Sequence, residues 1–597
     1  MKKAIVIILI LIAVGVGIAY YMTQMRGQKP ALPETTDAAL AAAQAPELLS
    51  YVPDTTALCV VFSSIAELKT AIENSAYFKK LSSTTIWQTF VSVASAKFEQ
   101  ALTNRELQAG IKVEPPDPKL LWDLVGDEVA VTFLPGQEPD AWAFAFLARV
   151  RNPQRLKNLA TLITDSAKNE GFAFSDIDYG GELIRKAVKA PNKGEFCLCQ
   201  THGLLTGSTD LEAIKSIIDL ISSDAKNSLA SSAGYRAVAS KLRADHFGEF
   251  FMKLGVDMAS VFTSVVSLDG LPMQTKTQGL PKMAGESLTR LYLKDGVQFE
   301  SYTALDVEKS DPKIVSLYRF KPNDLPLLSL APQGSTVTFA LNCLDAKVMY
   351  DIMLDSVMAQ NPMAAVMVSG FTTELEKKIG VSIADDLMPA VGPDVLFYYK
   401  GLSFKQALWL PELGFACSSS NPEKLYNAFP KIGDHLLSFA EDKAPEAKHV
   451  EDLYKGNTVH EIRLTMPIGE MSLAAAVVDK YFCVGFGREQ VNMMIDCLAG
   501  EHPQLKDQPE YRSISAGFPR ESNQIAYSDC EALWRQIRSA LQLYAQIGGS
   551  AESKEALEFV DILLMPLKTT FSTVIHEHPS ESIAVQRSYG HVKIEAE

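Results

Sequence analysis

The stretch Leu204–Ile221, LLTGSTDLEAIKSIIDLI, decides the predicted fold, because a similar stretch returns near the C-terminus as Phe482–Leu498, FCVGFGREQVNMMIDCL. Each stretch reads as an apolar strand, a glycine turn and an amphipathic helix with its apolar residues at helical spacing. Other landmarks recur in the same order. Among them are two Asn-Pro dipeptides, at Asn152 and Asn421, which suit the first turn of a helix. The sequence therefore predicts a tandem repeat.

Within each copy, the predicted strands mostly follow one another through short turns, which favours antiparallel pairing. The amphipathic helices between them predict a helical layer against the sheet. We expect an α+β fold of two tandem repeats, each an antiparallel sheet with helices on one face, after an N-terminal transmembrane helix. The expected divisions are residues 1-22 for the transmembrane anchor or signal, 23-46 for a linker, 47-325 for repeat lobe 1 and 326-597 for repeat lobe 2.

The N-terminal segment begins Met1-Lys2-Lys3 and then runs from Ala4 to Met22 without a charged residue. That length is sufficient for a membrane-spanning helix, and the basic start favours a cytoplasmic N-terminus. Gly17-Ile18-Ala19 also fits a signal-peptide cleavage site, so cleavage stays open. The sequence predicts a single-pass protein of the bacterial inner membrane, held in the membrane by residues 4-22, with the bulk of the chain in the periplasm.

Charge and composition narrow the choice of partners. The 597 residues include 56 Lys and Arg against 71 Asp and Glu, a formal net charge of −15. No basic run interleaved with aromatic residues is present, which argues against nucleic acid as a partner. The eight cysteines have no spacing in common between the two copies, so buried single thiols are expected and any pairing stays open.

Motifs for catalysis are weak throughout. Gly207 and Gly485 lie in turns without the spacing or lysine of a phosphate-binding loop. Ser223 and Lys226 form a lone Ser-x-x-Lys without its companion motifs. His576 and His578 could share one face of a strand, but no further metal ligands are identifiable. We therefore predict no catalytic residues, no metal site and no cofactor.

Two corresponding segments resemble a known family. The first runs from Glu106–Val113 through Leu120–Val125 to Gly126-Asp127-Glu128-Val129, and the second from Leu375–Ile383 through Asp385–Val391 to Gly392-Pro393-Asp394-Val395. A helix that ends at glycine, a short acidic segment, a turn and a strand resembles the uncharacterised bacterial family "domain of unknown function 3352". The Pro115-Pro116 insertion in the first copy departs from the pattern. The resemblance implies export, and it implies neither a known activity nor site residues.

One apolar stretch of the second copy is unusually rich in methionine, with Met349, Met353, Met358, Met363 and Met367 spaced by four or five residues. Methionine fills irregular cores, lines adaptable grooves and can coordinate copper(I), so three interpretations stay open. We take Met353, Met358, Met363 and Met367 as candidate binding residues, and we expect them to line the concavity between the two lobes or its rim.

These patterns favour a membrane-anchored envelope protein that binds or scaffolds another envelope protein or an apolar ligand without catalysis. The alternative is an envelope hydrolase whose site is assembled from residues distant in sequence.

Overall fold

The structure is a computed structural model, and it describes residues 45–63, 125–136, 142–153, 164, 168, 171–189, 195–223, 226–255, 281–293, 296–360, 362–405, 408–438, 447–466, 469–548 and 567–594. Twenty strands within these residues form one antiparallel sheet. The first ten are β1 (Leu58–Phe62), β2 (Val125–Pro135), β3 (Trp142–Val150), β4 (Phe172–Tyr179), β5 (Glu182–Lys189), β6 (Glu195–Thr201), β7 (Leu204–Ser208), β8 (Gly248–Leu254), β9 (Gly285–Leu293) and β10 (Val297–Asp306). The others are β11 (Val337–Leu341), β12 (Val391–Lys405), β13 (Leu408–Ser419), β14 (Ala447–Tyr454), β15 (Asn457–Met466), β16 (Gly469–Val478), β17 (Tyr481–Phe486), β18 (Gln524–Asp529), β19 (Leu567–Ser580) and β20 (Ile583–Ile594).

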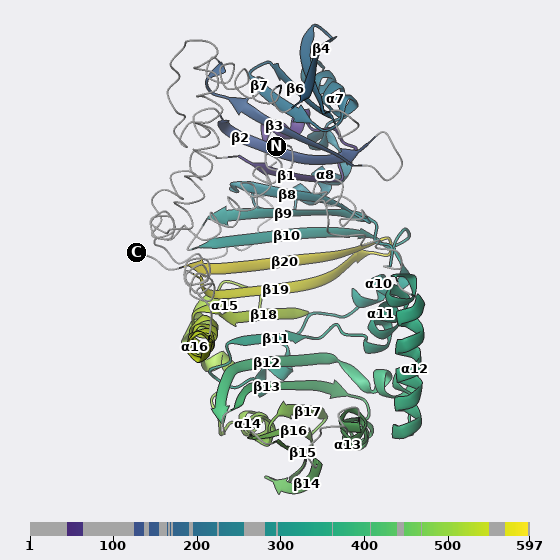
Figure 1. Cartoon of the computed structure of the whole chain (residues 1–597), viewed down its shortest axis with the longest axis vertical. Helices are drawn as coiled ribbons and strands as arrows, with labels where there is room; N and C mark the ends of the chain where they lie inside the picture. The colour runs from purple at the N-terminus through teal and green to yellow at the C-terminus, as the bar shows by residue number, and fades with distance from the viewer. Residues whose placement is uncertain are drawn as a thin grey trace.

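Strand order is symmetric about the pair β10–β20, which lies in the middle of the sheet (Figure 1). From that pair outward, one side runs β10-β9-β8-β1-β2-β3-β7-β6-β5-β4. The other runs β20-β19-β18-β11-β12-β13-β17-β16-β15-β14. The two sides therefore use the same succession of strand pairs.

The continuous sheet corrects the predicted fold. We expected two lobes, each with its own sheet, whereas β10 and β20 pair along Val297–Asp306 and join all the strands into one. The physical reason is that two separate sheets would each expose an edge strand with unpaired N–H and C=O groups there. Pairing the two edges satisfies both. The predicted division between residues 325 and 326 stays a prediction.

The strand, turn and helix expected at both organising stretches are present. β7 leads into α7 (Leu211–Ser222), whose first turn is capped by the Asp210 carboxylate, which accepts from the backbone N–H of Ala213 at 3.0 Å. β17 leads through Gly487, at a φ of 90°, into α14 (Arg488–Leu498). Aspartate is a favourable N-cap, and glycine adopts positive φ without strain.

Helices cover both faces of the sheet in its second half, so the expectation of helices on one face was also wrong. Ala475 packs in a cluster with residues of α13 (Pro422–Ser438), whereas its neighbours Ala474 and Ala476 pack in a cluster with residues of α14. Successive residues of a strand point to opposite faces, so the two helices lie on opposite sides. The other α-helices in the described part of the chain are α8 (Ala233–Ala239), α10 (Pro312–Leu317), α11 (Ala346–Gln360), α12 (Pro362–Ile379), α15 (Pro509–Ser515) and α16 (Cys530–Gly548).

A buried charged cluster lies in the first half of the sheet. The fully buried Arg290 of β9 donates through Nε to Oε1 of Glu249 on β8 at 2.8 Å. The hydroxyl of Tyr235 donates to Oε2 of the same carboxylate at 2.6 Å, and Nε2 of His246 lies 2.7 Å from Oε1. Burial acts to raise the pKa of Glu249, but these partners outweigh it and hold the pKa below its usual value. The carboxylate is therefore ionised in the core.

The predicted membrane location also needs correction. Among the described residues, no helix is both long enough and apolar enough to cross a bilayer. The structure therefore does not support a single-pass inner-membrane protein with an N-terminal transmembrane helix, and we do not retain that location. The predicted span at residues 4-22 and most of the 23-46 linker lie outside the described residues.

Candidate functional site: the exposed face of α11 and α12

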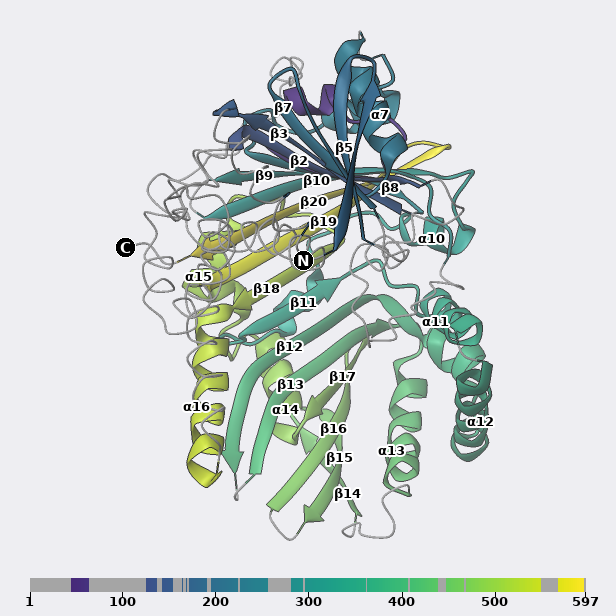
Figure 2. The ribbon, with the colours of Figure 1, turned by 45° about the horizontal axis from the view of Figure 1, so that its top comes forward.

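The two methionine-bearing helices lie beside the second half of the sheet, next to α13 (Figures 1 and 2). The Asp345 carboxylate caps α11 by accepting from the backbone N–H of Val348 at 3.0 Å. Lys313 of α10 donates to Asp355 of α11 at 2.6 Å, which ties the two helices together. The cap marks the start of α11, and the exposed ion pair connects this helix to α10.

Helix α12 is anchored at its C-terminal end. Leu375 and Ile379 are buried in a cluster with Val395 of β12 and Leu425 of α13. Lys431 of α13 donates to the carbonyl oxygen of Ile379 at 2.9 Å. The first half of the helix lacks such burial, because none of its side chains that the structure describes is buried before Leu375.

All four predicted binding residues are exposed. The exposed fraction is 51% for Met353 and Met358, 75% for Met363 and 72% for Met367. The structure therefore rules out core packing for these side chains. That they line a concavity between the two halves of the chain, or its rim, stays a prediction.

Three further apolar side chains are exposed on the same helices, and the sequence analysis did not select them as site residues. They are Met349 on α11 and Val366 and Phe371 on α12. On α12 the exposed apolar residues follow the spacing i, i+3, i+4 and i+8 from Met363, which puts them on one stripe. We call the seven exposed side chains the methionine face: Met349, Met353, Met358, Met363, Val366, Met367 and Phe371.

An outward apolar stripe is unusual for a helix beside a sheet. Such a helix normally turns polar side chains to the solvent and apolar ones to the core. On α12, Met367, Phe371 and Leu375 are four residues apart and so lie on one face of the helix. Leu375 is buried, whereas Phe371 and Met367 are exposed. Grouped exposed apolar residues mark places where other molecules bind. Unbranched methionine side chains also adapt to partners of different shape. The face can therefore bind an apolar surface, and the copper(I) interpretation stays a prediction.

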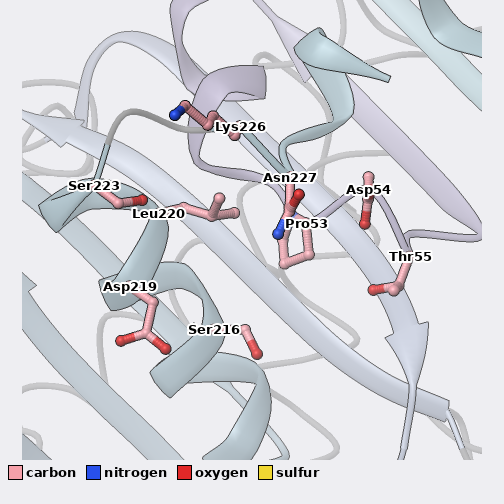
Figure 3. Close-up of a pocket in the computed structure, with 9 residues that line it drawn as sticks. All are labelled: Pro53, Asp54, Thr55, Ser216, Asp219, Leu220, Ser223, Lys226 and Asn227. Carbon is pink, nitrogen blue, oxygen red and sulfur yellow. The ribbon is translucent and has the colours of Figure 1, made fainter. Parts of the chain in front are cut away.

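A pocket of about 540 Å³ beside α7 is a place where a hydrolase site could be sought. Ser223 and Lys226, the lone Ser-x-x-Lys pair, are among its lining residues. Figure 3 shows the labelled side chains spread around the pocket rather than pointing to one place. Asp219, which also lines the pocket, accepts a hydrogen bond from the Tyr179 hydroxyl at 3.0 Å. No nucleophile and base are thus paired among these lining residues, and the hydrolase interpretation stays a prediction.

The other residues weighed from sequence lie in structural settings. His576 is buried, stacks on Tyr318 with ring centroids 4.7 Å apart, and has its pKa lowered by burial to about 4, whereas His578 is exposed. All eight cysteines are free thiols, and six of them are buried. In the described part of the chain, no three His, Cys, Asp or Glu side chains are grouped so as to hold a metal ion.

One polar cluster was missed altogether. Asp434 on α13 and three residues of the β14–β15 hairpin, His449, Glu451 and His460, form a hydrogen-bonded chain. A usable signal was present in the sequence: Lys455-Gly456 between two alternating segments predicts a two-residue hairpin turn. That turn fixes the register and places Glu451 opposite His460.

Comparison with known proteins adds no relative. No family model matches the chain, and neither a curated protein nor a solved structure is detectably similar to it. The resemblance to the "domain of unknown function 3352" family therefore stays a prediction, and the methionine face is the candidate functional site.

Proposed function

We propose that this chain is a non-enzymatic binding protein whose methionine face holds the apolar side of an amphipathic helix from another protein. The observation that carries the proposal is the exposure of Met363 and Met367, each above 70%, on a helix that is firmly anchored at its other end. The exposed apolar residues of α12 are spaced i, i+3, i+4 and i+8 from Met363, so they form a stripe along which the apolar side of a second helix can pack.

A protein partner suits the charge of the chain better than a lipid surface. The net charge of −15 opposes approach to anionic lipid. Asp355 of α11 is half exposed but already pairs with Lys313. The net charge of the chain, rather than this carboxylate, favours a partner helix with basic residues beside its apolar side.

The expected affinity is moderate. Complete burial of one methionine side chain contributes about 1.5–3 kcal/mol, so four would contribute about 6–12 kcal/mol. Association itself costs about 4–15 kcal/mol. The balance favours a dissociation constant in the micromolar range or weaker, which suits an exchangeable partner.

The test uses a synthetic amphipathic helical peptide with leucine on one side and lysine and glutamine on the other. Methyl NMR of the full chain, labelled at the methionine ε-methyl groups, should show shifts for Met353, Met358, Met363 and Met367 on titration. Met494, which is fully buried, should not respond. Shifts that spare the four exposed methionines, or no binding at millimolar peptide, would overturn the proposal.

Substitution gives the matching control. Met363→Gln with Met367→Gln should weaken peptide binding about tenfold or more, because two apolar contacts are lost. Leu453→Gln changes an apolar residue of similar exposure, 72%, on β14 and should leave binding unchanged. Equal effects of the two changes would show that the peptide binds nonspecifically.

A further inference from the structure

Four side chains form a continuous hydrogen-bonded chain between α13 and the β14–β15 hairpin. Oδ1 of Asp434 lies 2.7 Å from Nε2 of His449. Nδ1 of His449 lies 3.0 Å from Nε2 of His460, and Nδ1 of His460 lies 3.0 Å from Oε1 of Glu451. Each ring therefore uses one nitrogen for a carboxylate and the other for its neighbouring ring.

The hairpin register and α13 bring these groups together. Glu451 pairs directly with His460, and His449 pairs with Ile462, so His449, Glu451 and His460 share one face of the hairpin. The rings of Tyr426 and Phe429 on α13 meet His460 edge-on, with centroids 6.4 and 6.1 Å away. His460 is thereby enclosed, with its side chain only 9% exposed.

The number of protons that the three hydrogen bonds require gives the charge of the two histidine rings. An ionised carboxylate only accepts hydrogen bonds, so the nitrogens facing Asp434 and Glu451 must both carry a proton. The bond between the rings needs one more proton. Two neutral imidazoles hold only two protons, so three satisfied bonds require one extra proton shared by the pair.

We propose that this shared proton makes the Asp434–His449–His460–Glu451 chain a pH-dependent clamp that fastens α13 to the β14–β15 hairpin. Loss of the proton leaves a lone pair facing another lone pair or a carboxylate, so one bond of the three is lost. A fourth proton sets two N–H groups against each other between the rings and also breaks the chain. The clamp is closed only while the pair holds three protons.

Acidic groups lie at both ends of the two rings. Among the described residues, the titratable groups that face the rings are the two carboxylates and the hydroxyl of Tyr426, which donates to Glu451 at 3.5 Å. Lys448 and Glu461 alternate to the opposite face of the hairpin, where Glu461 pairs with Arg463. The hydrogen bond from His460 lowers the pKa of Glu451, which keeps that carboxylate an acceptor.

The first measurement is nitrogen-15 NMR of the histidine rings in the full chain, which distinguishes a ring nitrogen that carries a proton from one that does not. Near neutral pH, the four nitrogens of His449 and His460 should together carry three protons. Two neutral rings with the inter-ring bond intact would overturn the proposal.

The second measurement is hydrogen exchange of the α13 amides between about pH 5 and about pH 9, corrected for the intrinsic pH dependence of exchange. The wild-type protein should lose about tenfold protection in α13 once the shared proton is gone, the change expected for one lost charge-assisted bond. The control variant His578→Gln, at an exposed histidine on β19, should behave like the wild type. Protection that does not vary with pH would refute the clamp.

Asp434→Asn separates the clamp from an ordinary structural contact. An asparagine amide donates to the unprotonated Nε2 of His449, so all three bonds are satisfied with two neutral rings. The variant should keep α13 protected at high pH, where the wild-type protein loses protection. If Asp434→Asn instead loses protection with pH as the wild type does, the shared proton does not control α13.

Discussion

Replacing Arg290 by methionine should strongly destabilise the first half of the sheet. The guanidinium is fully buried and donates to Glu249 at 2.8 Å, and also to the carbonyl oxygens of Leu242 and Arg243 at 3.1 and 2.7 Å. Hydrogen bonds of a charged group contribute about 1.5–3 kcal/mol each, and the change also leaves the Glu249 carboxylate without the guanidinium. We expect a loss of about 3–5 kcal/mol, a large part of the stability of a typical protein.

Urea denaturation followed by tryptophan fluorescence measures this loss. The double variant Arg290→Met with Glu249→Leu should recover most of the stability, because it removes both buried charges together. Arg185→Met breaks an exposed pair with Asp176 on β4 and β5 and should cost less than about 1 kcal/mol. If Arg290→Met costs no more than Arg185→Met, the assignment of a stabilising buried charge cluster is wrong.

Four other outcomes follow from the structure. The pKa of Glu249 in the folded protein lies below its unfolded value of about 4.5. Its contribution to the free energy of unfolding is therefore complete above about pH 4.5 and should be lost as the pH falls through the folded pKa. Acid unfolding curves of the wild type and of Glu249→Gln measure this loss. Changing Met353, Met358 and Met363 together to leucine should leave the thermal midpoint within a few degrees, because the side chains are exposed, whereas core sites would lose up to about 1.5 kcal/mol each. Gly296→Ala should destabilise by about 2 kcal/mol or more in urea, since φ is +108° and a Cβ would lie 2.1 Å from a β20 carbonyl oxygen. Burial raises the pKa of Cys417 to about 12, so its thiol should not react with a thiol reagent at about pH 8 until the protein unfolds.

Local elements were predictable because their signals are local. Alternation, turn glycines and helix caps identified β7 with α7 and β17 with α14, and the Asn421 side chain caps α13 by accepting from the backbone N–H of Lys424 at 3.1 Å. The joining of β10 to β20 was not predictable in this way. The sequence of a strand does not show which distant strand it pairs with. Two separate sheets and one continuous sheet are both consistent with the same local patterns.

The candidate site was only partly predictable for the same reason. The spacing of Met363 and Met367 showed an apolar stripe, but spacing cannot say whether a stripe faces a core or the solvent. That depends on what packs beside it, and among the described side chains of α12 only Leu375 and Ile379 are buried. The hydrogen bonds that link Asp434, His449 and His460 form only because α13 packs against the β14–β15 hairpin. Such tertiary packing cannot be read from local sequence patterns.

The pairing of β10 with β20 also sets an order of events during synthesis. Synthesis of β10 is complete when the ribosome has added residue 306, whereas synthesis of its partner β20 is complete only at residue 594. A ribosome adds about 5–20 residues per second, so the edge of the first half stays open for many seconds while the second half emerges. During that time the row of unpaired backbone groups on β10 can pair with strands of other nascent chains. Cells that make this protein quickly must therefore protect that edge, and chains cut short before β20 should depend most on chaperones.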